Sequence, residues 1–286
     1  MHGPLVIATC RAWPQPSESD RLYLDALARR GVEVRYAPWN GEIASFMSAG
    51  AVVLRSTWDY HHDLAAFRRW LGLLEVAAVP VLNPPALVRW NLDKRYLLEL
   101  QAAGVRIPRT SIAPREPSAL RATLEREGWG QAVLKPAWGA SGFGIRRVDA
   151  GDPAVGDATG TPSRPMLLQE FLPEIACGEV SLVYLGGEFS HAVLKRPAPG
   201  EFRVNSQYGG IAELCDPAEA MRAAGAAVVD ALPVAPLYAR VDGVLREGAL
   251  VVMEVELHEP GLWLHLAPGS AERFADATLQ RLGAAA

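Results

Sequence analysis

The chain has 286 residues, of which 50% are hydrophobic and 21% charged, a composition that supplies folded cores and excludes a disordered polymer. Its net charge of −4 disfavours nucleic acid or an anionic membrane as a partner, because proteins that bind them usually carry a basic excess. The three cysteines form no C-x-x-C pair, so we expect neither a disulfide framework nor a zinc site. No stretch is long and apolar enough for a signal core or a membrane span, and the sequence predicts a soluble protein of the reducing cytoplasm.

Strand-like and helix-like segments alternate over residues 1–90. One helix is expected with Ser17 or Ser19 as its N-cap and Gly31 as its stop signal, and apolar residues recur at helical spacing over 64–74. Alternation of this kind predicts a small α/β domain with a parallel sheet. The expected strands are Leu5–Thr9, 32–36, Ala51–Leu54 and 79–82.

Residues 91–165 and 166–286 predict a different class, in which antiparallel hairpins combine with helices as α+β subdomains. The expected elements are, in order, a helix with Leu92, Tyr96 and Leu100 on one stripe, segments at 107–113, Ala132–Pro136 and 145–148, a helix near 118–127, a surface loop at 150–165, a hairpin at 179–195, a helix capped by Asp216, a hairpin at 237–257 and a closing helix at 270–282.

A glycine-rich turn, Gly139-Ala140-Ser141-Gly142-Phe143-Gly144, follows the strand that contains Lys135. It is neither a Walker A loop nor a dinucleotide fingerprint, because its order is G-x-x-G-x-G and no G-K-[ST] follows. Backbone N–H groups in such a turn can approach phosphate oxygens, and Lys135 would add positive charge. Phosphate binding is the favoured interpretation, and a lysine that only protects a strand edge is the alternative.

Charged residues gather in the last predicted hairpin. Glu254 and Glu256 are two apart on one strand and share a face, which is costly inside an apolar run unless a cation compensates. A three-residue loop, Arg246-Glu247-Gly248, would place Arg240 opposite Glu254 with Asp242 on the same face, whereas a two-residue loop would turn Asp242 away unless a bulge restored it. Three converging carboxylates favour a magnesium site, and an exposed face of Arg–Glu pairs is the alternative.

Three further cations stand near element ends: Lys94 near a helix start, Lys195 at a strand end and Arg203 in the segment 201–210. Each alone would be a solvated surface charge. Together with Lys135 and the carboxylates they fit a triphosphate that is neutralised by lysines, arginines and Mg²⁺.

The order of these motifs resembles the ATP-grasp superfamily of carboxylate–amine ligases, from about Asn91 to Pro260. The resemblance implies an α/β N-terminal domain followed by two α+β ATP-grasp subdomains that hold ATP between them. Glu256 stands where the family usually has asparagine, which leaves the number of metal ions open. The matching positions are Lys94 and Lys135 on the phosphates, Ser141, Gly142, Phe143 and Gly144 in the flap, Glu170, Phe171 and Leu172 in the adenine hinge, Glu179 on the ribose, and Asp242, Glu254 and Glu256 on the metal, with Arg240 beside them.

Two smaller segments refine the resemblance. The stretch 200–205, followed by Gly209-Gly210, is similar to the glutathione-synthetase branch, which implies that Arg203 contacts the transferred phosphate and Asn205 the metal. The segments 55–60 and 254–260 resemble a subgroup that includes the cyclo-ligase of cycloserine biosynthesis, which closes O-ureido-serine into a ring. The expected substrate contacts are Arg55, Ser56, Trp58, Asp59, Gly209 and Gly210, and an aromatic brace with a helix-capping Asp59 is the alternative for 58–60.

The resemblance implies an ATP-dependent ligase that uses Mg²⁺, with Mn²⁺ as an alternative, on a small amino-acid-like substrate. The substrate carboxylate would become an acyl phosphate that an amine then displaces, and the moving phosphoryl group would be stabilised by Lys195, Arg203 and Arg240. Ring closure and intermolecular ligation both stay open, and a homo-oligomer, either dimer or tetramer, is expected. The alternatives are a nucleotide-binding sensor without chemistry and a dinucleotide-dependent oxidoreductase built on residues 1–90.

Overall fold

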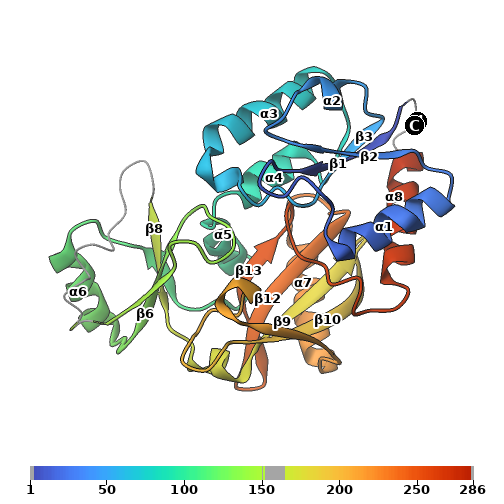
Figure 1. The fold of residues 1–286 in the computed structure, drawn as a ribbon. Helices are drawn as coiled ribbons and strands as arrows, with labels where there is room; N and C mark the ends of the chain where they lie inside the picture. Colours follow the sequence, from blue (N-terminus) through green and yellow to red (C-terminus); the bar gives the residue numbers. More distant parts are fainter. Residues whose placement is uncertain (1–2, 150, 152–164, 285–286) are drawn as a thin grey trace.

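The computed structural model describes residues 3–149, 151 and 165–284, so most of the surface loop expected at 150–165 lies outside the described residues (Figure 1). The chain forms three sheets, which we call the N-terminal, middle and large sheets. In Figure 1 the N-terminal sheet lies at the top of the view, the middle sheet at the left and the large sheet below.

The N-terminal sheet has the order β2-β1-β3-β4 and is parallel throughout, as predicted. Ser17 caps α1 as expected, since its side-chain oxygen accepts a hydrogen bond from the backbone N–H of Asp20 at 3.1 Å. The elements are β1 (Leu5–Thr9), α1 (Glu18–Arg29), β2 (Val34–Pro38), α2 (Ala44–Met47), β3 (Ala51–Leu54), η1 (Tyr60–His62), α3 (Leu64–Val76) and β4 (Val81–Leu82).

The middle sheet is antiparallel, with the order β5-β8-β6-β7. Lys135 lies in β6, which has a partner strand on each side, so the alternative of a lysine that protects a sheet edge is wrong. Strand β8 follows residue 165 in the chain but pairs within this sheet. The elements are β5 (Thr110–Ile112), α6 (Pro117–Glu127), β6 (Ala132–Pro136), β7 (Arg146–Val148) and β8 (Met166–Glu170).

The large sheet is antiparallel, with the order β11-β10-β9-β12-β13, and contains both predicted hairpins. The expected capping role of Asp216 is wrong, because α7 begins at Glu219 and Ala218 occupies the capping position. The elements are η3 (Pro173–Cys177), β9 (Glu179–Leu185), β10 (Glu188–Arg196), η4 (Ser206–Tyr208), β11 (Ile211–Cys215), α7 (Glu219–Asp230), β12 (Tyr238–Arg246), β13 (Ala249–Glu256) and α8 (Ser270–Ala284).

The helix expected through Leu92, Tyr96 and Leu100 begins only at Tyr96, as α5 (Tyr96–Ala102). Leu92 is instead the C-cap of a separate helix, α4 (Pro85–Asn91), which was not predicted. In the break between them, the backbone N–H of Lys94 donates to the carbonyl oxygen of Ala137, at the end of the middle sheet, at 2.6 Å. The break therefore connects the two helices to the residues that follow β6.

The C-terminal helix α8 lies beside α1, so the end of the chain joins the N-terminal part (Figure 1). The Tyr23 ring stacks on Phe274 at 3.9 Å, and the Tyr23 hydroxyl is 2.7 Å from the hydroxyl of Thr278. This shared core also includes Tyr238 of β12, which unites the N-terminal and large sheets. Among the described residues, no helix combines the length and apolarity that crossing a membrane requires.

Candidate active site

A cavity between the middle and large sheets collects most of the residues expected to bind nucleotide and metal. Gly144 belongs to the loop that covers the cavity but is not part of its lining. The expected residues that line it are Lys94, Lys135, Ser141, Gly142, Phe143, Glu170, Phe171, Leu172, Glu179, Lys195, Arg203, Asn205, Arg240, Asp242, Glu254 and Glu256.

The β12–β13 hairpin reaches the expected arrangement by a different register. The connecting loop has two residues, Glu247 and Gly248, both with positive φ, and Arg246 pairs with Ala249, so the expected three-residue loop is wrong. A bulge at Met253 then shifts the pairing. As a result Asp242 lies opposite Glu254 and Arg240 opposite Glu256, instead of Arg240 opposite Glu254, yet all four side chains still line the cavity.

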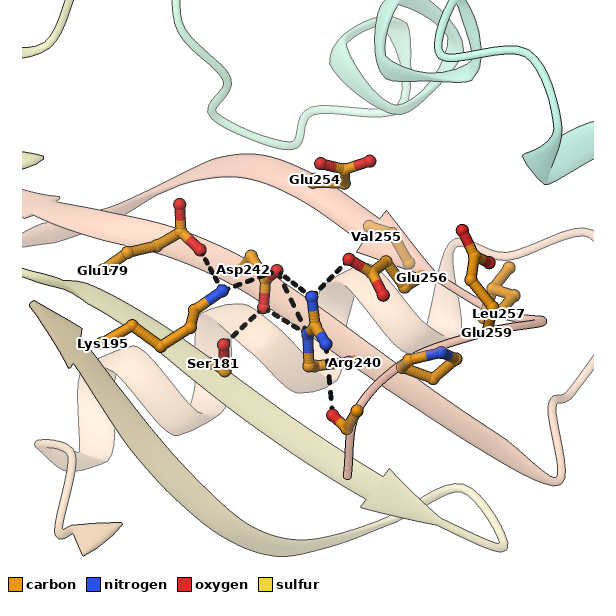
Figure 2. Close-up of polar contacts among 12 residues, drawn as sticks. Glu179, Ser181, Lys195, Arg240, Asp242, Glu254, Val255, Glu256, Leu257 and Glu259 are labelled. Carbon is orange, nitrogen blue, oxygen red and sulfur yellow. Dashed lines mark hydrogen bonds and ion pairs between the residues drawn. The ribbon is translucent and has the colours of Figure 1, made fainter. Parts of the chain in front are cut away.

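The carboxylate of Asp242 is at the centre of a buried network (Figure 2). It accepts hydrogen bonds from the guanidinium of Arg240 at 2.8 and 2.9 Å, from Lys195 Nζ at 3.1 Å and from the Ser181 hydroxyl at 2.6 Å. Burial alone would raise the pKa of Asp242, but Arg240 and Lys195 outweigh it and hold this pKa well below its usual range. Asp242 is therefore ionised at neutral pH.

Two further carboxylates extend this network at its ends. Lys195 also contacts Glu179, and Arg240 also contacts Glu256 (Figure 2). Burial raises the pKa of both glutamates, although the neighbouring cations oppose it. Carboxylates and cations therefore alternate along this network, and its two cations, Lys195 and Arg240, line the charged end of the cavity.

Two buried lysines enter the cavity from the other side. Lys94 contacts Glu254, and Lys135 Nζ donates to the carbonyl oxygen of Met253 at 3.1 Å. Burial lowers the pKa of Lys94, and burial together with Lys94 lowers the pKa of Lys135 to about 7. Lys135 contacts a neutral carbonyl oxygen, whereas Lys94 already has a carboxylate partner that an anionic ligand such as a phosphate could replace.

The glycine loop (residues 139–144) covers this charged end. Ser141, Gly142 and Gly144 have positive φ, a conformation that exposes backbone N–H groups. The carbonyl oxygen of Ser141 accepts from the Gln207 amide at 2.6 Å, and that of Gly139 accepts from the Tyr60 hydroxyl at 3.2 Å. The loop is thus held between η4 and the N-terminal part, over the cavity.

Arg203 and Asn205 approach the cavity from the segment before η4. A Cβ atom on Gly142 would come within 3.1 Å of Asn205 Oδ1, so glycine permits the close approach of the loop. Arg203 pairs with Glu201 at 2.6 Å and lies over the Tyr208 ring at 3.6 Å. Arg203 is therefore already oriented, although it does not contact the central network.

The opposite end of the cavity is apolar and is bounded by the expected hinge, 170–172. Glu170 forms ion pairs with Arg109 and Arg246, whose hydrogen bonds lower its pKa, while the Leu172 side chain is buried. A cavity with one apolar end and one charged end matches a nucleotide, whose base is largely apolar and whose phosphates are anionic. The apolar lining comprises Val133, Phe171, Leu172, Ile175, Phe202 and Met253.

The structure does not bring the expected substrate contacts Arg55, Ser56, Trp58 and Asp59 to the cavity lining. Arg55 is buried in an ion pair with Asp20 at 2.7 Å. Asp59 accepts hydrogen bonds from the Trp39 indole at 2.6 Å and from the Asn40 amide at 2.8 Å, and it makes no capping hydrogen bond to η1.

Gly209 and Gly210 also lie outside the lining. Gly209 ends η4 with a positive φ, and a Cβ atom on Gly210 would overlap the carbonyl oxygen of Val204 at 2.1 Å. Both glycines shape the backbone that leads out of η4.

Two residues of the site have no predicted role. Glu259 lines the cavity and is 7% exposed, and its sequence signal is its place in the acidic segment 254–260. The Trp263 ring lies 5.0 Å from the Arg240 guanidinium and 5.7 Å from Lys195 Nζ. No sequence signal identifies Trp263, because its contacts depend on how the chain after β13 folds back.

The carboxylates fit a hard cation by chemistry, since Asp242, Glu254 and Glu256 offer only oxygen ligands. In the described part of the chain, however, no three acidic, histidine or cysteine side chains are already arranged around a metal position. The reason is that Lys94 pairs with Glu254, and Arg240 with Asp242 and Glu256. The three carboxylates could hold Mg²⁺ once an anionic ligand draws these cations away.

Comparison with known proteins agrees with this geometry. The family model for the N-terminal domain of D-cycloserine synthetase DcsG matches residues 5–83, and that for the ATP-grasp domain of prokaryotic glutathione synthetase matches residues 96–234. Both matches confirm the predicted resemblance.

Individual relatives cover most of the chain. Cycloserine biosynthesis protein DcsG of Streptomyces lavendulae is 30% identical over 91% of this chain and 92% of its own length. A glutathione synthetase of Parasynechococcus marenigrum (strain WH8102) is 31% identical over 74% of this chain and 67% of its own length. The crystal structure of D-cycloserine synthetase DcsG superposes with a TM-score of 0.87 at 28% identity, covering 98% of this chain and 100% of that one.

Proposed function

The chain belongs to the ATP-grasp family of carboxylate–amine ligases, and from that premise we propose that it forms a C–N bond through an acyl phosphate on an amino-acid-like substrate. Ring closure of an O-ureido-serine-type substrate is the preferred form of the reaction, because the N-terminal match and the relative that spans the chain both belong to the cycloserine subgroup. The observation that carries the proposal is the cavity whose described lining holds four buried cations and six carboxylates beneath a glycine loop.

In the first step the substrate carboxylate oxygen attacks the γ-phosphorus of ATP, and the bond to the leaving oxygen of ADP breaks. Lys94 and Lys135 would hold the phosphates, and Lys195 and Arg240 would stabilise charge on the phosphoryl group in transfer. Arg203 would contact the same group from the segment before η4. Mg²⁺, held by Asp242, Glu254 and Glu256 with Asn205 nearby, would neutralise phosphate charge when bound.

In the second step a substrate nitrogen attacks the acyl carbon, and in an O-ureido-serine-type substrate this is the ureido N–H next to the side-chain oxygen. The C–N bond forms, the acyl C–O bond to phosphate breaks, inorganic phosphate leaves and the nitrogen releases its proton. The glycine loop would exclude water from the acyl phosphate during this step, because hydrolysis would waste the activated carboxylate. The Gln207–Ser141 and Tyr60–Gly139 hydrogen bonds support such closure.

Nucleotide product analysis tests the proposal. The purified protein would be incubated with Mg²⁺ and ATP and with separate pools of D- and L-amino acids, O-ureido-serine included. We expect ADP and phosphate with one pool and not with buffer alone. AMP and pyrophosphate would instead indicate adenylation, and tight ATP binding without turnover in any pool would favour a nucleotide sensor.

A further inference from the structure

Glu259 differs from the other acidic side chains that line the described part of the cavity. Glu170, Glu179, Asp242, Glu254 and Glu256 each contact a lysine or an arginine. Glu259 contacts neither, although its side chain is only 8% exposed. Its ion-pair partner in the described part of the chain is His258, whose Nε2 atom lies 2.7 Å from Oε2 and carries a charge only when the ring is protonated. Figure 2 shows the Glu259 carboxylate apart from the dashed network around Asp242.

The carboxylate is nevertheless charged. Burial would raise the pKa of Glu259, but the neighbouring His258, Lys94 and Arg240 outweigh it and lower this pKa. A buried carboxylate that lacks a hydrogen-bonded cation carries a desolvation cost that a cationic ligand would remove. Among the acidic side chains that line the described part of the cavity, Glu259 is therefore the one whose partner is a histidine and not a permanently charged lysine or arginine.

The N-terminal part of the chain fixes the position of Glu259. The Trp58 indole donates to the carbonyl oxygen of Glu259 at 2.9 Å, and Arg55 donates to the carbonyl oxygen of Pro260 at 2.8 Å. The His258 ring packs against Tyr60 at 4.8 Å. Glu259 thus stands where the N-terminal part meets the charged end of the cavity.

We infer that Glu259 binds the ammonium group of an amino-acid substrate and so selects amino acids over carboxylic acids that lack the amine. The inference deepens the proposed function and rests on it for the class of substrate. Asp59, the carboxylate expected from sequence to make such a contact, already accepts hydrogen bonds from Trp39 and Asn40. Trp58 of the same segment contributes instead by holding the backbone of Glu259.

Equilibrium binding tests the inference without turnover. The wild-type protein, saturated with Mg²⁺ and a non-hydrolysable ATP analogue, would be titrated with three pairs of probes: alanine and propanoate, glutamate and glutarate, and O-ureido-serine and 3-(ureidooxy)propanoate, each chiral probe as both enantiomers. A hydrogen-bonded charge pair predicts that the preferred amino acid binds about 10- to 100-fold more tightly than its partner without the amine. In the Glu259→Gln variant this preference should disappear, while the affinity for the ATP analogue stays the same.

Two variants serve as controls. Glu247→Gln makes the same chemical change in the exposed β12–β13 turn and should keep the wild-type preference. Glu259→Asp keeps the charge and should keep part of the preference, which covers the case in which Glu259→Gln fails to fold. The inference is overturned if no amino acid binds better than its partner, if Glu259→Gln keeps the preference, or if its only change is a higher Mg²⁺ requirement.

Failure of the proposed function has a different signature. If the amino-acid preference depends on Glu259 but none of the bound probes gives ADP, the role of Glu259 is supported and the proposed ligase chemistry is rejected. ADP and phosphate formation with an unchanged preference in Glu259→Gln would retain the ligase and remove this role of Glu259.

Discussion

Two buried Arg–Asp pairs in this chain have nearly the same burial and opposite surroundings. Arg55 and Asp20 are each 2% exposed, and Arg240 and Asp242 are 7% and 4% exposed. Each guanidinium also lies over an aromatic ring, Arg55 over Tyr238 at 5.2 Å and Arg240 over Trp263 at 5.0 Å. Burial and ion pairing alone therefore do not identify a functional site.

The surroundings separate the two pairs. Around the Arg55–Asp20 pair the other hydrogen-bond partners are neutral. The carbonyl oxygen of Pro260 accepts from Arg55, and the hydroxyls of Ser17 and Ser56 donate to Asp20. Around Arg240 the network continues through charged groups into the cavity. A pair enclosed by neutral groups stabilises the fold, whereas a pair linked to further charges at a cavity can exchange partners with a ligand.

The largest effect is expected from Asp242→Asn. We expect turnover to fall by at least about 1,000-fold, because the variant removes a charge that organises both Arg240 and Lys195 at the reacting phosphate. The fold should persist, since Arg240 keeps Glu256 and Lys195 keeps Glu179. Substrate-dependent ADP release and circular dichroism measure the two outcomes. Near-normal turnover would remove Asp242 from the proposed active site.

Arg55→Met should lower the stability of the fold and not the chemistry of the active site, the reverse of Asp242→Asn. It leaves Asp20 buried without its cation, which should lower the free energy of unfolding by about 3–5 kcal/mol in urea denaturation. Replacing Asp20 by Leu as well should recover part of this loss, because no charge then stays buried unpaired. The folded fraction should keep its wild-type affinity for ATP, because Arg55 does not line the cavity. An unchanged stability with a raised KM would return Arg55 to the substrate site.

The first pair also shows where sequence analysis reaches its limit. Arg55 and Asp20 are 35 residues apart, so their pairing depends on how β3 and α1 pack, and sequence pattern alone suggested a substrate contact. Motifs along one segment, such as Lys135 with the glycine loop, were recoverable because their spacing is local. Glu259 belongs to the acidic segment 254–260, but its position at the cavity and its contact with His258 depend on the three-dimensional fold.

The secondary-structure elements also separate into those that local sequence predicts and those that depend on distant contacts. Strands Leu5–Thr9, Ala51–Leu54, Ala132–Pro136 and Glu179–Leu185 could be predicted to the residue from apolar runs between turn signals. Strand β11 was missed because residues 211–214 are exposed and show no apolar alternation. The break between α4 and α5 was missed because apolar residues continue at helical spacing through it, while the backbone N–H of Lys94 makes its hydrogen bond to Ala137, a residue distant in the sequence.

The lowered pKa of Lys135 predicts that ATP binding to the cavity depends on pH. Because burial and Lys94 lower the pKa of Lys135 to about 7, the free protein holds this lysine increasingly neutral above pH 7. A bound triphosphate favours the charged form and raises this pKa, so nucleotide binding should take up a proton above pH 7. Affinity for ATP should therefore fall by up to about tenfold per pH unit above 7, until the pKa of the bound state is reached.

Calorimetry in buffers of different ionisation enthalpy would measure the proton uptake directly. Lys135→Ala should bind ATP more weakly and lose the uptake between pH 7 and 8.5. If this variant kept the wild-type affinity, Lys135 would not be a phosphate ligand. If the variant kept the uptake, another group would be the one that titrates.

The smallest effect is expected from removing the Trp263 ring, which lies beside Arg240 and Lys195. Trp263→Leu removes the ring from Arg240 and Lys195 and leaves their carboxylate partners in place. A cation–π contact contributes about 0.5–1 kcal/mol, so turnover should fall by about two- to fivefold with no change in the ATP affinity. Trp263→Phe keeps a ring and should recover most of the loss. If Trp263→Leu instead lost as much turnover as Asp242→Asn, the ring, and not the carboxylate network, would hold Arg240 in place. In that case the difference between the two Arg–Asp pairs would come from their aromatic neighbours.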